Sequence, residues 1–166
     1  MSIETGAPAP DIRLPAWANG AATELALADY RRGSGTAAAG TSLVLYFYPK
    51  DSTPGCTTES QDFRDLYEQL RTHGAEVIGI SRDSLASHQK FAERHSLPFP
   101  LLCDGDEIAC RAFDVIREKN MYGRKVMGIE RSTFLIDADG VVREIWRKVK
   151  VKGHAHAVFE RLQTLD

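Results

Sequence analysis

The chain has 166 residues, of which 43% are hydrophobic and 27% are charged, and its formal net charge is −2. This length predicts one domain over residues 1–166, and the balanced charge gives no reason to expect binding to nucleic acid or to an anionic membrane. No apolar run approaches the roughly 20 residues that span a bilayer, and the N-terminus lacks a basic and then apolar signal pattern. We therefore expect a cytoplasmic protein.

The first part of the chain reads as extended and loop-rich. Three prolines within residues 1–20 suit an extended arm or edge strands. Residues 23–27 fit a short strand, and the Gly- and Ala-rich residues 31–40 fit a loop. Residues 42–48 are β-branched, aromatic and almost uninterrupted in their apolar character, which predicts a buried strand.

From Cys56 onward the apolar residues follow a helical period. They recur at i, i+3, i+4 and i+7, as Phe63, Leu66, Tyr67 and Leu70. This spacing predicts a helix that ends near residues 73–74. The pattern then predicts a buried strand at 76–81 and a helix from an N-cap at Ser84 to about residue 94.

The last part of the chain predicts a strand pair followed by a helix. Asp139-Gly140 between two apolar runs indicates a hairpin. The other expected elements are a short strand at 101–102, a short helix at 107–113, a polar loop at 117–128 and a final helix after residue 154. The order β-α-β-α-β and then β-β-α predicts an α/β fold with a mixed sheet and helices on both faces, as in thioredoxin-like folds.

Cys56 stands where the strand pattern ends and the helical pattern begins. The thiolate is the nucleophilic form of cysteine, and an unperturbed cysteine is only a few per cent thiolate at neutral pH. The first turn of a helix favours the anion through unpaired N–H groups and the helix dipole. Pro49, Pro54 and Gly55 shape the turn, and Thr53 adds a hydroxyl. We therefore interpret Cys56 as a reactive group; the alternative is an ordinary small residue at the start of a helix.

The residues around Cys56 resemble the active-site motif of the peroxiredoxins. Pro49, Thr53 and Cys56 have the spacing P-x-x-x-T-x-x-C, and residues 47–59 read FYPKDSTPGCTTE. This stretch is similar to the PrxQ branch, also called bacterioferritin comigratory protein. Further similar stretches extend the likeness over nearly the whole chain: GAPAPD at 6–11, ISRDS at 80–84 and ERSTFLID at 130–137.

The resemblance implies a thiol peroxidase on a thioredoxin-like fold. Cys56 would attack hydrogen peroxide or an organic hydroperoxide and become a sulfenic acid. Thr53 would hold the peroxide and the thiolate, and Pro49 would shield the sulfur from water. Arg131 would place its guanidinium beside the sulfur, although the sequence alone does not pair it with Cys56. Glu59 would either orient Arg131 or cap the helix.

The chain departs from the family where a second cysteine is expected. A sulfenic acid must be returned to a thiol, commonly through a resolving cysteine. The two positions at which PrxQ proteins carry that cysteine align with Gln61 and Ala92. Cys103 and Cys110 lie in apolar stretches and read as buried small residues. We favour a one-cysteine cycle completed by an external thiol; an internal disulfide between Cys56 and Cys103 or Cys110 is the alternative.

The resemblance also implies partners. The substrate would be a hydroperoxide, and the reductant would be thioredoxin, glutaredoxin with glutathione, or another small thiol; no cofactor or metal is expected, and a monomer is favoured. A thioredoxin-like disulfide oxidoreductase would need a C-x-x-C pair, which Cys56 lacks. A redox-signalling adaptor or holdase is an alternative of another class. The histidines at positions 73, 88 and 95 are expected on polar helix faces without a function.

Overall fold

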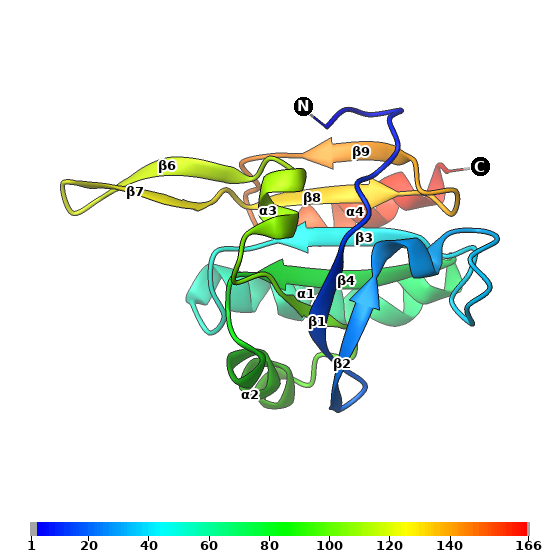
Figure 1. Ribbon diagram of the computed structural model, residues 1–166, viewed down its shortest axis with the longest axis horizontal. Coiled ribbons are helices and arrows are strands. Elements are labelled where there is room, and N and C mark those ends of the chain that lie inside the picture. The colour runs from blue at the N-terminus through cyan, green and yellow to red at the C-terminus, as the bar shows by residue number, and fades with distance from the viewer. Residues whose placement is uncertain (1–2, 166) are drawn as a thin grey trace.

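A computed structural model describes residues 3–165 of the chain. Its centre is a seven-stranded mixed sheet with the order β2-β1-β5-β4-β3-β8-β9, and β6 and β7 form a separate hairpin (Figure 1). The strands are β1 (Arg13–Ala18), β2 (Ala21–Ala26), β3 (Ser42–Phe47), β4 (Ala75–Ser81), β5 (Leu101–Cys103), β6 (Ile116–Met121), β7 (Arg124–Ile129), β8 (Ser132–Ile136) and β9 (Val142–Trp146). The helices are η1 (Leu27–Tyr30, a 3-10 helix), α1 (Pro54–Thr72), α2 (Leu85–His95), α3 (Ile108–Ala112) and α4 (His154–Gln163).

Strand β3 is the buried centre of the sheet, as its apolar run predicts. Leu45 and Phe47 point into the core on one face, and Val44 and Tyr46 point into the core on the other. This alternation is the two-residue period of a strand. β3 pairs in parallel with β4 and antiparallel with β8, so it is buried on both faces and paired on both edges.

Helices cover both faces of the sheet (Figure 1). α1 and α4 pack against one face, where Phe63 and Val158 join the core around Tyr46. The segment of α3 and the N-terminal arm cover the opposite face, where the rings of Phe113 and Phe47 lie 5.3 Å apart. The expected α/β thioredoxin-like arrangement is confirmed. Among residues 3–165, no helix has both the length and the apolar character needed to cross a bilayer.

The expectation of a polar loop at 117–128 is wrong, because these residues form most of the β6–β7 hairpin. The strands pair from Ile116 opposite Ile129 to Met121 opposite Arg124, and the hairpin extends away from the sheet (Figure 1). Most of its side chains are exposed or half-buried, so no apolar face marks the strands in the sequence. The turn residues Tyr122 and Gly123 have positive φ angles of 54° and 79°. Turns with two positive φ angles usually carry Asn-Gly, so tyrosine at the first position gives no hairpin signal in the sequence.

The sheet brings two distant segments to one edge. β3 runs into the loop that leads to Cys56, and Phe47 at its end pairs with Ser132 at the start of the antiparallel strand β8. Arg131, directly before Ser132, therefore lies beside the loop between β3 and α1. The fold itself supplies the pairing that the sequence does not show.

Candidate active site

Cys56 lies in the first turn of α1, as predicted. Thr53 is the N-cap residue with extended backbone angles (φ −91°, ψ 153°), and Pro54 takes the first helical position, where a missing N–H is tolerated. The Cys56 residue is only 1% exposed. The helix start favours a negative charge on the sulfur, and burial shields that sulfur from bulk water.

Arg131 contacts Cys56 from the start of β8. Its Nη2 atom donates to Sγ over 3.2 Å, and its Nη1 atom donates to Oε1 of Glu59 over 2.6 Å. A planar guanidinium can donate in two directions at once, which an ammonium cannot do with the same geometry. A Cβ atom at Gly55 would stand 3.3 Å from Nη2, so glycine leaves room for the guanidinium beside the sulfur.

Glu59 is buried and accepts a hydrogen bond from Arg131. Its side chain is 1% exposed, and its Oε2 atom has no hydrogen-bond partner within residues 3–165. Burial raises the pKa of Glu59 to about 7, and the charge of Arg131 opposes that rise. The side chain of Thr53, the N-cap residue, makes no capping hydrogen bond to α1, and within residues 3–165 the side chain of Glu59 bonds to Arg131 alone. Of the two interpretations of Glu59, the structure favours the one in which it orients Arg131.

Pro49 and Thr53 frame the loop that leads to Cys56. The hydroxyl of Thr53 donates its only proton to the carbonyl oxygen of Lys50 over 2.8 Å, which leaves its lone pairs free to accept from a ligand. Pro49 is half-buried and lies two positions beyond the end of β3. In the part of the chain that is described, no side-chain hydrogen bond joins Thr53 to Cys56.

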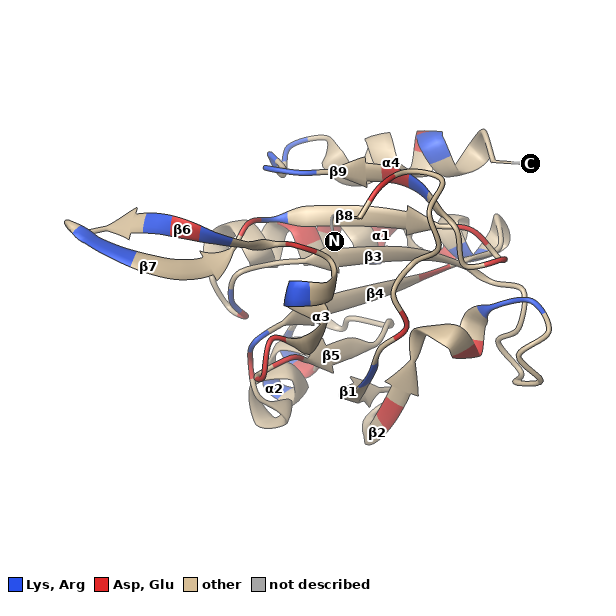
Figure 2. Cartoon of the chain, turned by 45° about the horizontal axis from the view of Figure 1, so that its top comes forward, with Lys and Arg blue, Asp and Glu red and all other residues tan. Residues whose placement is uncertain are grey.

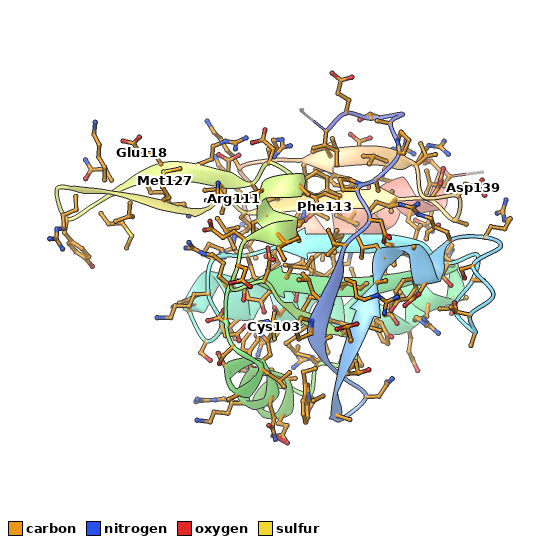
Figure 3. The ribbon with its side chains drawn as sticks, in the orientation of Figure 1. Cys103, Arg111, Phe113, Glu118, Met127 and Asp139 are labelled. Carbon is orange, nitrogen blue, oxygen red and sulfur yellow. The ribbon has the colours of Figure 1, made fainter. Side chains whose placement is uncertain are left out.

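The remaining cysteines are free thiols, like Cys56. Cys103 is half-buried at the end of β5 (Figure 3). Burial, Asp51 and Asp83 raise the pKa of Cys103 to about 11. Cys110 is fully buried on α3, and burial together with Asp104 raises the pKa of Cys110. Both thiols are held in the protonated form, which is the poorly nucleophilic one.

The two positions at which a resolving cysteine was expected lie on different helices. Gln61, on α1, is half-buried, and its amide nitrogen lies 3.3 Å from Nδ1 of His95. Ala92, on α2, is 4% exposed and belongs to the same core cluster as Cys56. Neither side chain has a thiol, so neither can form a disulfide with Cys56.

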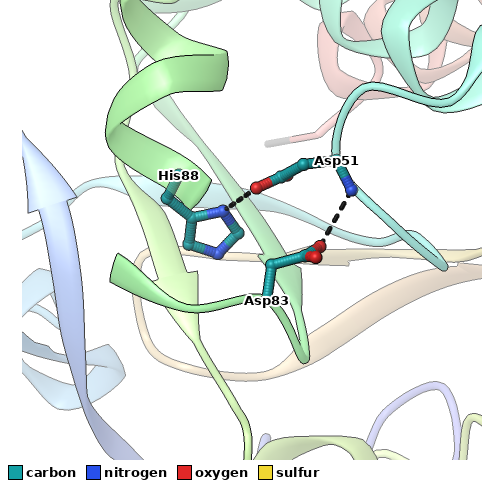
Figure 4. Close-up of side chains that lie close together, drawn as sticks. All are labelled: Asp51, Asp83 and His88. Carbon is teal, nitrogen blue, oxygen red and sulfur yellow. Dashed lines mark hydrogen bonds and ion pairs between the residues drawn. The ribbon is translucent and has the colours of Figure 1, made fainter. Parts of the chain in front are cut away.

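A buried polar cluster beside the site was not predicted. His88 is fully buried, contrary to its expected place on a polar helix face. Its Nδ1 lies 2.7 Å from Oδ2 of Asp51 (Figure 4). Its Nε2 lies 2.9 Å from the carbonyl oxygen of Leu102. Asp83 accepts from the backbone N–H of Asp51 over 2.8 Å. The three side chains could supply metal ligands by type and proximity, but Asp51 and His88 already bond to each other. The bond between Asp51 and His88 joins the loop that precedes Cys56 to α2.

Comparisons with known proteins identify the relatives of this chain. The profile of the AhpC/TSA family matches residues 5–145. Peroxiredoxin Bcp of Bacillus subtilis is 49% identical over 99% of this chain and 96% of its own length. Peroxiredoxin Bcp of Xanthomonas campestris is 59% identical over 75% of this chain and 78% of its own length.

Solved structures give the same result. A cysteine-to-serine variant of Xylella fastidiosa PrxQ has a TM-score of 0.86 at 42% identity, covering 98% of this chain and 97% of that one. Peroxiredoxin Q of Xanthomonas campestris has a TM-score of 0.79 at 53% identity, covering 90% of this chain and 89% of that one. Another structure from that organism concerns the alkyl peroxide reduction activity of its bacterioferritin comigratory protein, and it covers 90% of both chains at 52% identity with a TM-score of 0.79. The chain therefore belongs to the AhpC/TSA family and to its Bcp or PrxQ branch of the peroxiredoxins, which are thiol-dependent peroxidases.

Proposed function

We propose that this chain reduces hydrogen peroxide and organic hydroperoxides at Cys56 by a one-cysteine cycle. The thiolate attacks the terminal oxygen of the hydroperoxide, the O–O bond breaks, and the departing hydroxide or alkoxide takes a proton to leave as water or an alcohol. Cys56 is then a sulfenic acid. The observation that carries the proposal is the 3.2 Å contact between the Arg131 guanidinium and Sγ of Cys56.

Each neighbouring residue has a role in that step. Arg131 stabilises the thiolate and the charge that develops on the departing oxygen, which is electrostatic stabilisation of the transition state. Glu59 fixes the direction of the guanidinium. Thr53 accepts a hydrogen bond from the O–H of the peroxide and so orients the peroxide, and Pro49 keeps water from the sulfur.

Recovery of Cys56 is assigned to external thiols. One thiol attacks the sulfenic acid, releases water and leaves a mixed disulfide; a second thiol attacks that disulfide and restores Cys56. The protonated, buried state of Cys110 and the raised pKa of Cys103 support this order of events over an internal disulfide. Thioredoxin, glutaredoxin with glutathione or another small thiol can serve as donor.

Peroxiredoxin Q of Xanthomonas campestris supports the view that this chain lacks a second cysteine on α2. Two Xanthomonas campestris structures are cysteine-to-serine variants at two positions separated by as many residues as Cys56 and Ala92. This equal spacing supports our alignment of Ala92 with a second cysteine of that relative. We place the cycle in the cytoplasm, where external thiols are available, and in a monomer, because one chain supplies every residue of the proposed site.

The test is peroxide consumption with thioredoxin, glutathione or dithiothreitol as donor, for the wild type and for Cys56→Ser. Cys56→Ser is expected to lose activity while Cys103→Ser and Cys110→Ser keep it. Retained activity in Cys56→Ser would refute the peroxidase proposal, and loss of activity in Cys103→Ser or Cys110→Ser would refute the one-cysteine cycle.

A further inference from the structure

The β6–β7 hairpin has two faces of different chemistry. Residues directly opposite each other in an antiparallel pair point to the same face, and the faces alternate along each strand. One face carries Ile116 with Ile129, Glu118 with Met127, and Asn120 with Lys125. The other carries Arg117 with Gly128, Lys119 with Val126, and Met121 with Arg124. We call this second face the cationic face, because within the two strands it has three basic residues and no acidic one.

The two faces also differ in how their charges are balanced. Figure 2 shows basic residues on both strands of the hairpin. Off the cationic face, Glu118 lies 3.6 Å from Lys125, so the two charges offset each other. On the cationic face, Arg117 pairs with Asp114 over 3.0 Å and with Glu130 over 3.9 Å. The other two cations of that face have no carboxylate within 4.0 Å among residues 3–165.

Exposed apolar side chains lie on the same ribbon. Of the five large hydrophobic residues that are exposed within residues 3–165, four belong to the hairpin: Met121, Tyr122, Val126 and Met127. Met121 and Val126 are on the cationic face, and Tyr122 stands in the turn at its end. Tyrosine, methionine and arginine are enriched at protein interfaces, and a ribbon of two strands without a third is only marginally stable by itself. This composition favours a partner protein that covers the ribbon.

The hairpin begins and ends beside the active site. At its base, the backbone N–H of Glu130 donates to the carbonyl oxygen of Val115 over 2.7 Å. The next residue is Arg131, whose Nη2 contacts Sγ of Cys56. Strand β6 spans about 17 Å, whereas a typical contact patch of about 800 Å² on one protein is roughly 30 Å across. A protein that binds the cationic face is therefore large enough to reach Cys56 as well.

We infer that the cationic face of the β6–β7 hairpin docks the reductant of Cys56, and that this reductant is an acidic, thioredoxin-type protein dithiol. Unbalanced cations beside exposed apolar side chains are complementary to a partner surface that is acidic and partly apolar. Recovery of Cys56 consumes two thiols, and a docked dithiol supplies both. The inference rests on the proposed one-cysteine cycle, in which an external thiol attacks the sulfenic acid.

The experiment measures kcat/KM for reduced thioredoxin and divides it by the rate of the same variant with dithiothreitol, which needs no docking surface. Arg124→Glu is expected to lower this ratio about 10-fold, because a like charge then faces the acidic partner. Met121→Ser is expected to lower it about 5-fold through the lost apolar contact. Added salt should weaken the wild type more than Arg124→Glu, since salt screens the attraction that the variant has already lost.

The opposite face supplies a matched control for each substitution. Lys125→Glu makes the same charge reversal at the next residue of β7. Met127→Ser removes a methionine that is 56% exposed, against 51% for Met121. Both controls are expected to keep the ratio within about 2-fold of the wild type, the range of ordinary surface substitutions.

A binding measurement without turnover separates this inference from the proposed function. Reduced thioredoxin is bound to the chain carrying Cys56→Ser, and Arg124→Glu is expected to weaken binding about 10-fold while Lys125→Glu does not. Equal effects of these two substitutions, or no binding at all, would overturn the inference. It would also be overturned if Arg124→Glu abolished a dimer or binding to phosphatidylglycerol vesicles and left thioredoxin binding intact. Absence of peroxide consumption with dithiothreitol would refute the peroxidase proposal alone.

Discussion

The guanidinium of Arg131 lies 2.6 Å from the carboxylate of Glu59, although 72 residues separate them in the chain. Glu59 is buried and Arg131 is half-buried, and the other terminal nitrogen of the guanidinium donates to the sulfur of Cys56. One guanidinium thus contacts both Glu59 and Cys56, so we propose that Glu59 acts on Cys56 through Arg131. The geometry of this contact, more than the charge of either residue alone, sets the direction of the donor that faces the thiolate.

Arg131→Lys keeps the charge but removes the planar donor pair. A single ammonium cannot reproduce both contacts, so we expect kcat/KM for peroxide to fall by about 100-fold, the loss typical of removing one transition-state donor. Steady-state kinetics measure this. Arg13→Lys is the control, since its side chain is 58% exposed, and an Arg131→Lys rate equal to that of Arg13→Lys would contradict the proposed role.

Glu59→Gln removes a titrating group from the core. The pKa of Glu59 is about 7 in the folded state and near 4.5 when unfolded. The folded state therefore binds the proton more tightly, and stability from this group is present below pH 4.5 and lost as pH rises through about 7. The loss is roughly 3 kcal/mol. Urea unfolding at pH 4.5, 6 and 8 should show the wild type losing stability relative to Glu59→Gln, whereas parallel curves would refute the raised pKa.

Gly55→Ala tests whether the close approach of Arg131 to residue 55 matters for activity independently of the stability of α1. Alanine at this position favours the helix by roughly 0.5 to 1 kcal/mol, but its Cβ would press on Nη2 of Arg131 at 3.3 Å. We expect unchanged or higher stability with kcat/KM about 10-fold lower, because small displacements of catalytic groups are costly. Gly105→Ala, whose Cβ would meet nothing closer than 3.9 Å, should change neither value. Full activity in Gly55→Ala would show that the close approach is unimportant.

His88→Leu breaks the cluster that fastens the Cys56 loop. Removing one partner of a buried, hydrogen-bonded pair leaves Asp51 without its histidine, which costs about 3 to 5 kcal/mol. Urea unfolding of His88→Leu and of the exposed His156→Gln tests this. A loss below about 0.5 kcal/mol, the range of ordinary surface substitutions, would mean that the pair contributes little.

Ala92→Cys restores a second cysteine at the aligned position. After one equivalent of peroxide, the intact mass of this variant is expected to fall by two hydrogens, as an internal disulfide forms. The wild type under the same conditions is expected to gain one oxygen. A gain of one oxygen by both proteins would show that α2 does not bring residue 92 to Cys56.

The sequence predicts the elements that have a periodic apolar pattern. β3 and α1 appear within one or two residues of their expected bounds because each buries a regular set of side chains, and Ser84 is confirmed as an N-cap whose hydroxyl accepts from the N–H of Ser87. The sequence does not predict the β6–β7 hairpin, because its strands have no continuous buried face and Tyr122 occupies a turn position with positive φ.

The site was only partly predictable for a related reason. Thr53 and Cys56 are close in the chain, so the local sequence pattern is enough to predict that both belong to the site. Arg131 contacts Cys56 across 75 positions, and only the family resemblance named it in advance. The burial of His88 depends on Asp51 and on the carbonyl of Leu102, which are brought to it by other segments, so its own helix gives no sign of it.

The central claim is that the Cys56 thiolate reduces the hydroperoxide and becomes a sulfenic acid. Its most direct measurement is a single turnover without reductant: one equivalent of hydrogen peroxide is added with a sulfenic-acid trap, the remaining peroxide is measured, and the labelled peptide is identified by mass spectrometry. The account predicts that peroxide is consumed one for one and that the label lies on Cys56. Unconsumed peroxide, or a label on a residue other than Cys56, would contradict it. A disulfide joining Cys56 to Cys103 or Cys110 would instead contradict the one-cysteine cycle.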